Sequence, residues 1–180
     1  GGDGDGLQRF FERSAYGTRS WLADAWFSGM RASDLIVKVA QDHGVNPVLL
    51  LARMQVEQSL VSKTVRPAQS RINKALGCGC PDGGSCSSAQ SGFERQLVCG
   101  AQTMTRWYDA SIEGNGLWRM GRSRNTLDPI SVTPRNHATA SMYAYTPWVL
   151  VGRGGNWLLW NVTRKYLVNL DQRGLLNVNP

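Results

Sequence analysis

The chain has 180 residues, 42% of them hydrophobic, and seven tryptophans, which excludes a disordered chain and allows one sizeable core. Its formal charge is +7, from 20 Lys and Arg against 13 Asp and Glu, so we expect an anionic partner. The cations are scattered and form none of the dense runs that are typical of nucleic-acid binding, so we expect no nucleic-acid partner. No apolar run approaches the ~20 residues of a membrane-spanning helix.

The first six residues, Gly-Gly-Asp-Gly-Asp-Gly, have the composition of a linker or of a scar left by trimming. They also lack the basic and apolar pattern of a secretory signal. We therefore expect a linker at residues 1–6 and a single domain at residues 7–180. Aromatic and charged residues are mixed with weak periodicity over residues 7–30, and we interpret this stretch as a helical lead-in segment.

Two helices follow with clearer signals. Ser33 is a suitable N-cap for a helix that Gly44 would end in the left-handed conformation. Asn46 and Pro47 then predict the cap and the first turn of a second helix, which should extend over residues 47–61. That helix is apolar almost all round, so we expect it in the middle of the domain.

A loop rich in Gly, Ser and Cys is predicted for residues 77–92. Ser91 and Glu94 have the spacing of a capping box, which would open the next helix. The stripe expected to bury this helix consists of Leu97, Ala101, Met104 and Tyr108.

The last third of the chain predicts a small irregular lobe and two more helices. Residues 111–135 have no helical period, and residues 130–133 alternate as a short strand would. Asn136 should cap a helix that stops before Pro147, and a final helix is expected at residues 156–168. With no internal repeat and no second domain, the fold class is mainly α (α+β), with a small β-hairpin lobe.

The four cysteines lie close together in the sequence. A four-thiolate zinc site usually shows paired Cys-x-x-Cys motifs, which this spacing lacks. An even number of cysteines in a Gly- and Ser-rich loop favours two disulfides in an oxidising compartment. Three pairings are possible, and we favour Cys80–Cys86 with Cys78–Cys99, because this pairing closes a small loop and ties it to the following helix.

Glu57 is the residue most suggestive of chemistry. On a helical period it shares a stripe with Leu50, Met54 and Val61. A carboxylate on a buried face is costly unless it is paired or protonated, and a protonated carboxylic acid can donate its proton to a glycosidic oxygen. The alternative is structural, namely a buried ion pair between Glu57 and Arg53 or another arginine.

Three segments together resemble a known family. Residues 44–61 resemble the catalytic helix of lysozyme-like lytic transglycosylases and related secreted actinobacterial and phage wall hydrolases, in which a Glu stands at the end of the helix. In the family a Ser usually follows this Glu directly, whereas in this chain Gln58 stands between Glu57 and Ser59. Residues 76–82 resemble the next loop of one secreted subgroup, and residues 136–147 its late helix. The resemblance covers roughly residues 33–170.

The resemblance implies a lysozyme-like fold with a groove for alternating N-acetylglucosamine and N-acetylmuramic acid, and neither a metal nor an organic cofactor. Glu57 would be the catalytic acid. Tyr143 or Tyr145 would line the cleft, with Ser59 as a further candidate for substrate binding. The family's usual Gly-Leu-Met-Gln motif is replaced here by the cysteine-rich loop.

Whether one or two carboxylates act is left open by the sequence. A lytic transglycosylase can work with Glu57 alone and gives a 1,6-anhydro product, whereas a muramidase normally needs a second carboxylate. The candidates are Asp82, Glu94, Asp109 and Asp128, of which Asp82 is the strongest because its loop follows the catalytic helix. Asp82 also suits a plain turn, Pro-Asp-Gly-Gly.

The expected enzyme is a monomer that acts on peptidoglycan strands of an anionic wall, in a secreted, periplasmic or cell-wall location. A wall-binding module of the same fold without catalysis is the competing hypothesis. Such a module would use the same groove, aromatic residues and positive charge.

Overall fold

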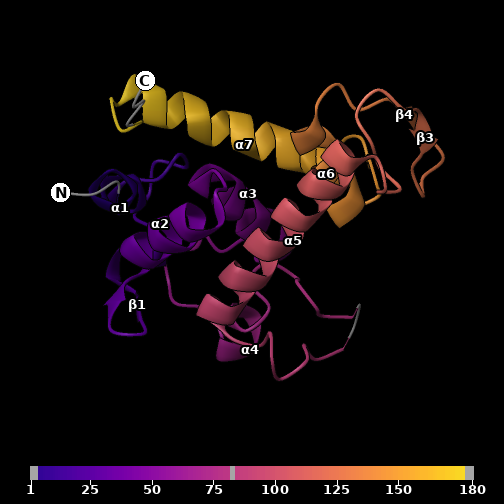
Figure 1. The fold of residues 1–180 in the computed structure, drawn as a ribbon. Helices are drawn as coiled ribbons and strands as arrows, with labels where there is room; N and C mark the ends of the chain where they lie inside the picture. Colours follow the sequence, from indigo (N-terminus) through magenta and orange to yellow (C-terminus); the bar gives the residue numbers. More distant parts are fainter. Residues whose placement is uncertain (1–3, 82–83, 177–180) are drawn as a thin grey trace.

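A computed structural model of the chain describes residues 4–81 and 84–176. Within these residues the structure is mainly α-helical, with two small antiparallel hairpins (Figure 1), which confirms the predicted class. The helices are α1 (Gly4–Glu12), the short 3-10 helix η1 (Trp21–Asp24), α2 (Ala32–His43), α3 (Pro47–Gln58), α4 (Gln69–Ile72), α5 (Phe93–Glu113), α6 (His137–Tyr145) and α7 (Gly155–Gln172). The strands are β1 (Trp26–Phe27), β2 (Met30–Arg31), β3 (Arg124–Asn125) and β4 (Ser131–Val132).

Helix α3 lies inside the molecule, as its apolar composition predicts. It packs against α2, α5 and α7, and in Figure 1 α7 runs along the outer edge above it. Leu50, Leu51 and Met54 of α3 are fully buried in the core. Helix α5 crosses the molecule, packs along α6 and also contacts α3.

The junction between α2 and α3 follows the local signals. Gly44 ends α2 in the left-handed conformation with φ +65°. The side chain of Asn46 accepts a hydrogen bond from the Val48 backbone N–H at 2.9 Å, and Pro47 is the first residue of α3. The predicted caps are confirmed, but α3 ends at Gln58 rather than near residue 61.

The N-terminal part differs from the expected lead-in helix. Gly4, Asp5 and Gly6, assigned above to a linker, form the first turn of α1, where Asp5 pairs with Arg31 at 2.8 Å. The prediction of one helical segment over residues 7–30 is wrong after residue 12, because η1 and the β1–β2 hairpin follow. The turn of this hairpin needs two positive φ values, which Ser28–Gly29 supplies.

Two predicted caps are wrong, and in both cases a side chain expected to cap the helix binds a distant side chain instead. Ser33 lies inside the first turn of α2, buried, and its hydroxyl donates to Gln8 of α1. At residues 91–94 no capping box forms: Gly92 precedes α5, and Glu94 accepts a hydrogen bond from Ser28 in the β1–β2 turn.

Two disulfides close the loop between α4 and α5. They join Cys78 to Cys99 and Cys80 to Cys86, which confirms the favoured pairing. The first disulfide fastens residues 76–78 to α5. None of the helices in the described part of the chain is long and apolar enough to span a membrane.

The C-terminal lobe contains the predicted hairpin, β3–β4, but α5 continues to Glu113, so the first three residues of the stretch 111–135 are helical rather than irregular. Asn136 caps α6 by accepting a hydrogen bond from the Thr139 N–H at 2.7 Å, and α6 ends before Pro147. Helix α7 extends to Gln172, beyond the predicted residue 168.

Candidate functional site

Glu57 lies one residue before the end of α3. Leu50, Met54 and Val61, its partners on the predicted stripe, are fully buried. The prediction that Glu57 shares this burial is wrong: its side chain keeps 31% of its surface exposed. Glu57 lies in the last turn of α3, which Ser59 ends by adopting a left-handed conformation with φ +54°.

The partner of Glu57 is Arg53, one turn earlier on α3. The Arg53 side chain is only 1% exposed, and its Nη2 donates to Glu57 Oε1 at 2.9 Å and to Thr146 Oγ1 at 2.8 Å. Its Nε and Nη1 find no hydrogen-bond partner among the described residues. The buried guanidinium therefore depends on Glu57 for its countercharge, which is the ion pair that the structural alternative expects.

Gly77 lies against the other oxygen of Glu57. It has φ +64°, and a Cβ built on it would lie 2.6 Å from Glu57 Oε2. Any side chain at residue 77 would therefore collide with the carboxylate. Arg53 therefore binds Oε1, whereas Oε2 has room beside residue 77 only because that residue is a glycine, and the disulfide at Cys78 anchors this segment to α5.

Tyr145, at the end of α6, completes this cluster. Its ring lies 4.0 Å from the Arg53 guanidinium, a cation–π contact, and its hydroxyl donates to the Leu76 carbonyl oxygen at 3.1 Å. Burial raises the pKa of Tyr145 to about 12, Arg53 opposes this rise, and Glu57 adds to it. The phenol therefore stays neutral at ordinary pH and holds both Arg53 and the segment before Gly77 in place.

The other residues proposed for substrate binding lie in different surroundings. Tyr143 stacks on the Trp118 ring, with centroids 5.0 Å apart, and lines a pocket of about 470 Å³ between α6 and α7. Burial, together with the charge of Asp128, raises the pKa of Tyr143. Ser59 is exposed, and its carbonyl oxygen accepts a hydrogen bond from Ser62. Asp82 lies outside the described residues.

The remaining candidate carboxylates have positions elsewhere. Asp128 accepts hydrogen bonds from the Val149 and Leu150 backbone N–H groups and from the Thr126 hydroxyl, which ties the β3–β4 lobe to the loop before α7. Glu94 accepts from the β1–β2 turn, and Asp109 is exposed on α5. None of the three is recorded in the cluster around Arg53.

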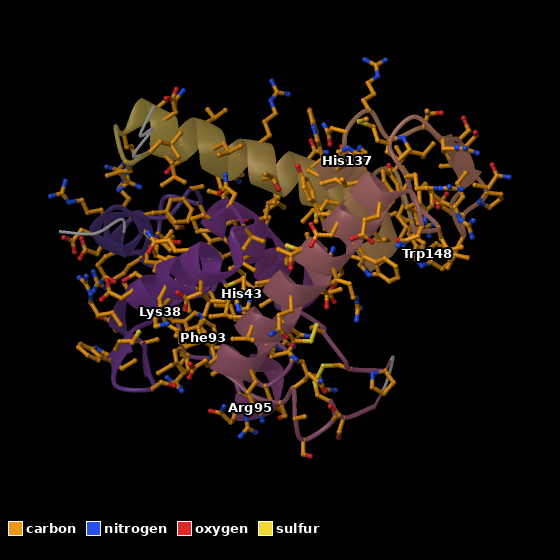
Figure 2. The ribbon with its side chains drawn as sticks, viewed as in Figure 1. Lys38, His43, Phe93, Arg95, His137 and Trp148 are labelled. Carbon is orange, nitrogen blue, oxygen red and sulfur yellow. A yellow bond between two sulfur atoms is a disulfide. The ribbon has the colours of Figure 1, made fainter. Side chains whose placement is uncertain are left out.

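The two histidines come from different elements and lie apart in Figure 2. His43 is the last residue of α2, and His137 is the first residue of α6, where its Nδ1 lies 2.9 Å from the Ser111 hydroxyl. Among the described residues, no group of three or more His, Cys, Asp or Glu is placed to hold a metal ion.

Sequence reasoning named Arg53 only as a structural partner and gave no role to Gly77 or Thr146. Arg53 and Glu57 are four residues apart on one helix, and this spacing predicts their contact. The contacts of Gly77 and Thr146 join segments distant in the sequence, so no local pattern revealed them. No protein-family model, no curated protein and no solved structure matches the chain.

Proposed function

We propose that this protein cleaves peptidoglycan glycan strands between N-acetylmuramic acid and N-acetylglucosamine, with Glu57 as general acid on a lysozyme-like fold. The observation that carries the proposal is the setting of the Glu57 carboxylate. It is bound by Arg53 and fits beside Gly77, yet it remains partly open to a ligand. The resemblance of residues 44–61 to the catalytic helix of lytic transglycosylases supports the same assignment.

The proposed reaction requires Glu57 to carry a proton when the substrate is bound. Arg53 favours the charged carboxylate, whereas a bound sugar would displace water from its exposed side and favour the protonated form. Glu57 then gives its proton to the glycosidic oxygen as the bond to the N-acetylmuramic acid carbon breaks. The resulting carboxylate takes the proton of that sugar's own 6-hydroxyl, which closes the anhydro ring and restores the acid.

A single-carboxylate reaction, that of a lytic transglycosylase, is the form we favour. Glu94 and Asp128 are engaged by other partners, and Asp109 lies on the exposed side of α5. A muramidase would require a second carboxylate, for which Asp82 is the remaining candidate. Two disulfides and a charge of +7 support an oxidising location beside an anionic wall.

The competing function is a wall-binding module without catalysis. One observation favours it: the ion pair with buried Arg53 explains Glu57 without any chemistry. The two functions differ in what the carboxylate does to a bound glycan, so the same variants can separate them.

The test is release of soluble fragments from purified peptidoglycan. Glu57→Gln keeps a side-chain oxygen for Arg53 but cannot donate a carboxylic proton, so we expect release to fall by about 10²- to 10⁴-fold. Glu12→Gln, an exposed carboxylate at the end of α1, is the control and should match the wild type.

Loss of folding is separated from loss of chemistry by a second variant. Arg53→Met with Glu57→Gln removes both charges, so no unpaired cation is left buried, and its folding is checked by circular dichroism. A folded double variant without activity supports the proposal. Wild-type protein that sediments with the wall but releases nothing would instead establish the binding module.

A further inference from the structure

The outer face of α7 is apolar although it faces solvent. Trp157, Trp160 and Val168 are exposed, with Trp160 at 61%, and Arg164 lies between them on the same stripe. In Figure 1 this helix forms the outer edge of the molecule. The opposite face supplies the core contacts through Leu159, Val162, Tyr166 and Leu170. The exposed tryptophans are therefore not needed to attach α7 to the fold.

Two hollows flank this stripe. One is the apolar pocket of about 470 Å³, which includes Trp157, Trp160 and Met142 in its lining. The other, of about 430 Å³, is lined by polar and basic side chains including Arg164. Asn161 lines both, so the two hollows meet on α7. The face thus combines one apolar hollow with a neighbouring hollow that carries the cations Arg164 and Lys165.

The charge around this face is mostly positive, and exposed Asp171, near the end of α7, is the one carboxylate of this helix. Residues 129–170 contain no Asp or Glu but four cations, Arg135, Arg153, Arg164 and Lys165. The Arg164 guanidinium lies 5.5 Å from the centroid of the Trp160 ring, and Lys165 lies over the Tyr16 ring at 4.2 Å. Cations therefore lie over the exposed Trp160 ring and the half-buried Tyr16 ring, and cations beside aromatic rings are typical of protein surfaces at the membrane–water boundary.

We propose that the outer face of α7 docks on an anionic lipid surface, with Trp157 and Trp160 inserted at the boundary between headgroups and acyl chains. A hydrophilic anionic polymer would pair with the cations but would leave the indole rings and Val168 in water. A second copy packed on the same face by two-fold symmetry would bring the Arg164–Lys165 pairs of both copies into one interface, where Asp171 is the one carboxylate that each α7 supplies. A lipid surface satisfies both the charges and the apolar groups.

The experiment is co-sedimentation with vesicles of phosphatidylcholine, with and without phosphatidylglycerol. Wild-type protein should bind the anionic vesicles far more strongly, and added salt should weaken binding. Trp160→Ala should lower partitioning by about tenfold. Arg164→Gln should lower it by about fivefold, as expected for one cation near a charged surface.

Matched control residues lie outside α7, in β1 and α4. Trp26 in β1 is 62% exposed, so Trp26→Ala removes an equally exposed indole, and Arg71→Gln removes an exposed cation on α4. Both should bind as the wild type does. The proposal would be overturned if Trp26→Ala weakened binding as much as Trp160→Ala does. It would also be overturned if wild-type protein bound neutral and anionic vesicles equally, or bound neither. So would a dimer in sedimentation velocity that Trp160→Ala abolishes. The result is independent of any role of Glu57 in glycan cleavage.

Discussion

At the end of α3, a buried arginine and a partly exposed glutamate share one hydrogen bond, and their surroundings differ sharply. Arg53 is enclosed by the Tyr145 ring and by Thr146, whereas Glu57 lies beside Gly77, at a place that a side chain on residue 77 would occupy. Removing Glu57 alone leaves a cation in the interior, so its loss affects stability as well as any chemistry. The position of the carboxylate therefore depends on residues that carry no chemistry themselves.

Gly77 gives the sharpest prediction at this scale. In Gly77→Ala the new methyl group has to displace the Glu57 carboxylate, and a misplaced acid should lower glycan release by about a hundredfold. The measurement is the rate of fragment release, with thermal melting to follow stability.

The control is Gly17→Ala, which has a similar left-handed φ of +76° but no neighbour within 4 Å. It should cost only the backbone strain, about 1 kcal/mol of unfolding free energy, and leave activity unchanged. Equal activity of the two alanine variants would show that the contact between Gly77 and Glu57 does not position the acid.

At the scale of elements, the sequence predicts best those contacts whose two residues lie close together in the chain. Asn46 and Asn136 cap their helices because the N–H groups they bind lie two and three residues away. Ser33 fails as a cap because its hydroxyl meets Gln8, 25 residues earlier. Ser28–Gly29 is a hairpin-turn signal that lies within the stretch interpreted as a helical lead-in segment.

The candidate site follows the same rule. The resemblance of residues 44–61 singled out Glu57, and its spacing from Arg53 on one helix indicated their pairing. The burial of Glu57 was predicted wrongly. The prediction extended the helical period to residue 61, whereas α3 ends at Gln58.

Asp128 links two elements, and its titration gives a pH-dependent prediction. Partial burial by itself raises its pKa, but hydrogen bonds from Leu150, Thr126 and Val149 outweigh this and lower the pKa to about 2. Because the folded pKa lies below the ordinary value of 3.8, the stabilisation is complete above about pH 5 and is lost as the pH falls towards 2. Asp128→Asn places an amide against backbone donors and should lower Tm at neutral pH.

The measurement is the difference in Tm between wild type and Asp128→Asn across this range. The difference should be constant from pH 5 to pH 7 and shrink between about pH 4 and pH 2. Asp109→Asn, at an exposed site on α5, should melt as the wild type does at each pH. A difference that stays constant down to pH 2 would contradict the role of the charged carboxylate.

For the whole molecule, the two proposals occupy separate places. The Arg53–Glu57 cluster lies where α3, α6 and the disulfide-bound loop meet, and the exposed tryptophans lie on the outer face of α7. A protein held at a lipid surface by α7 could act on a polymer with its other surfaces. Composition alone indicated an anionic partner, but the separation of the two surfaces follows only from the packing of α7 on α3.

The most direct measurement of the central claim is the mass of the glycan ends released from purified peptidoglycan. The account predicts 1,6-anhydro ends from the wild type and their absence from the folded double variant Arg53→Met/Glu57→Gln. Reducing ends, heavier by one water, would keep Glu57 as acid but require a second carboxylate. Release of the same ends by the double variant, or no release by the wild type, would contradict the assignment of Glu57 as the acid of a glycan-cleaving enzyme.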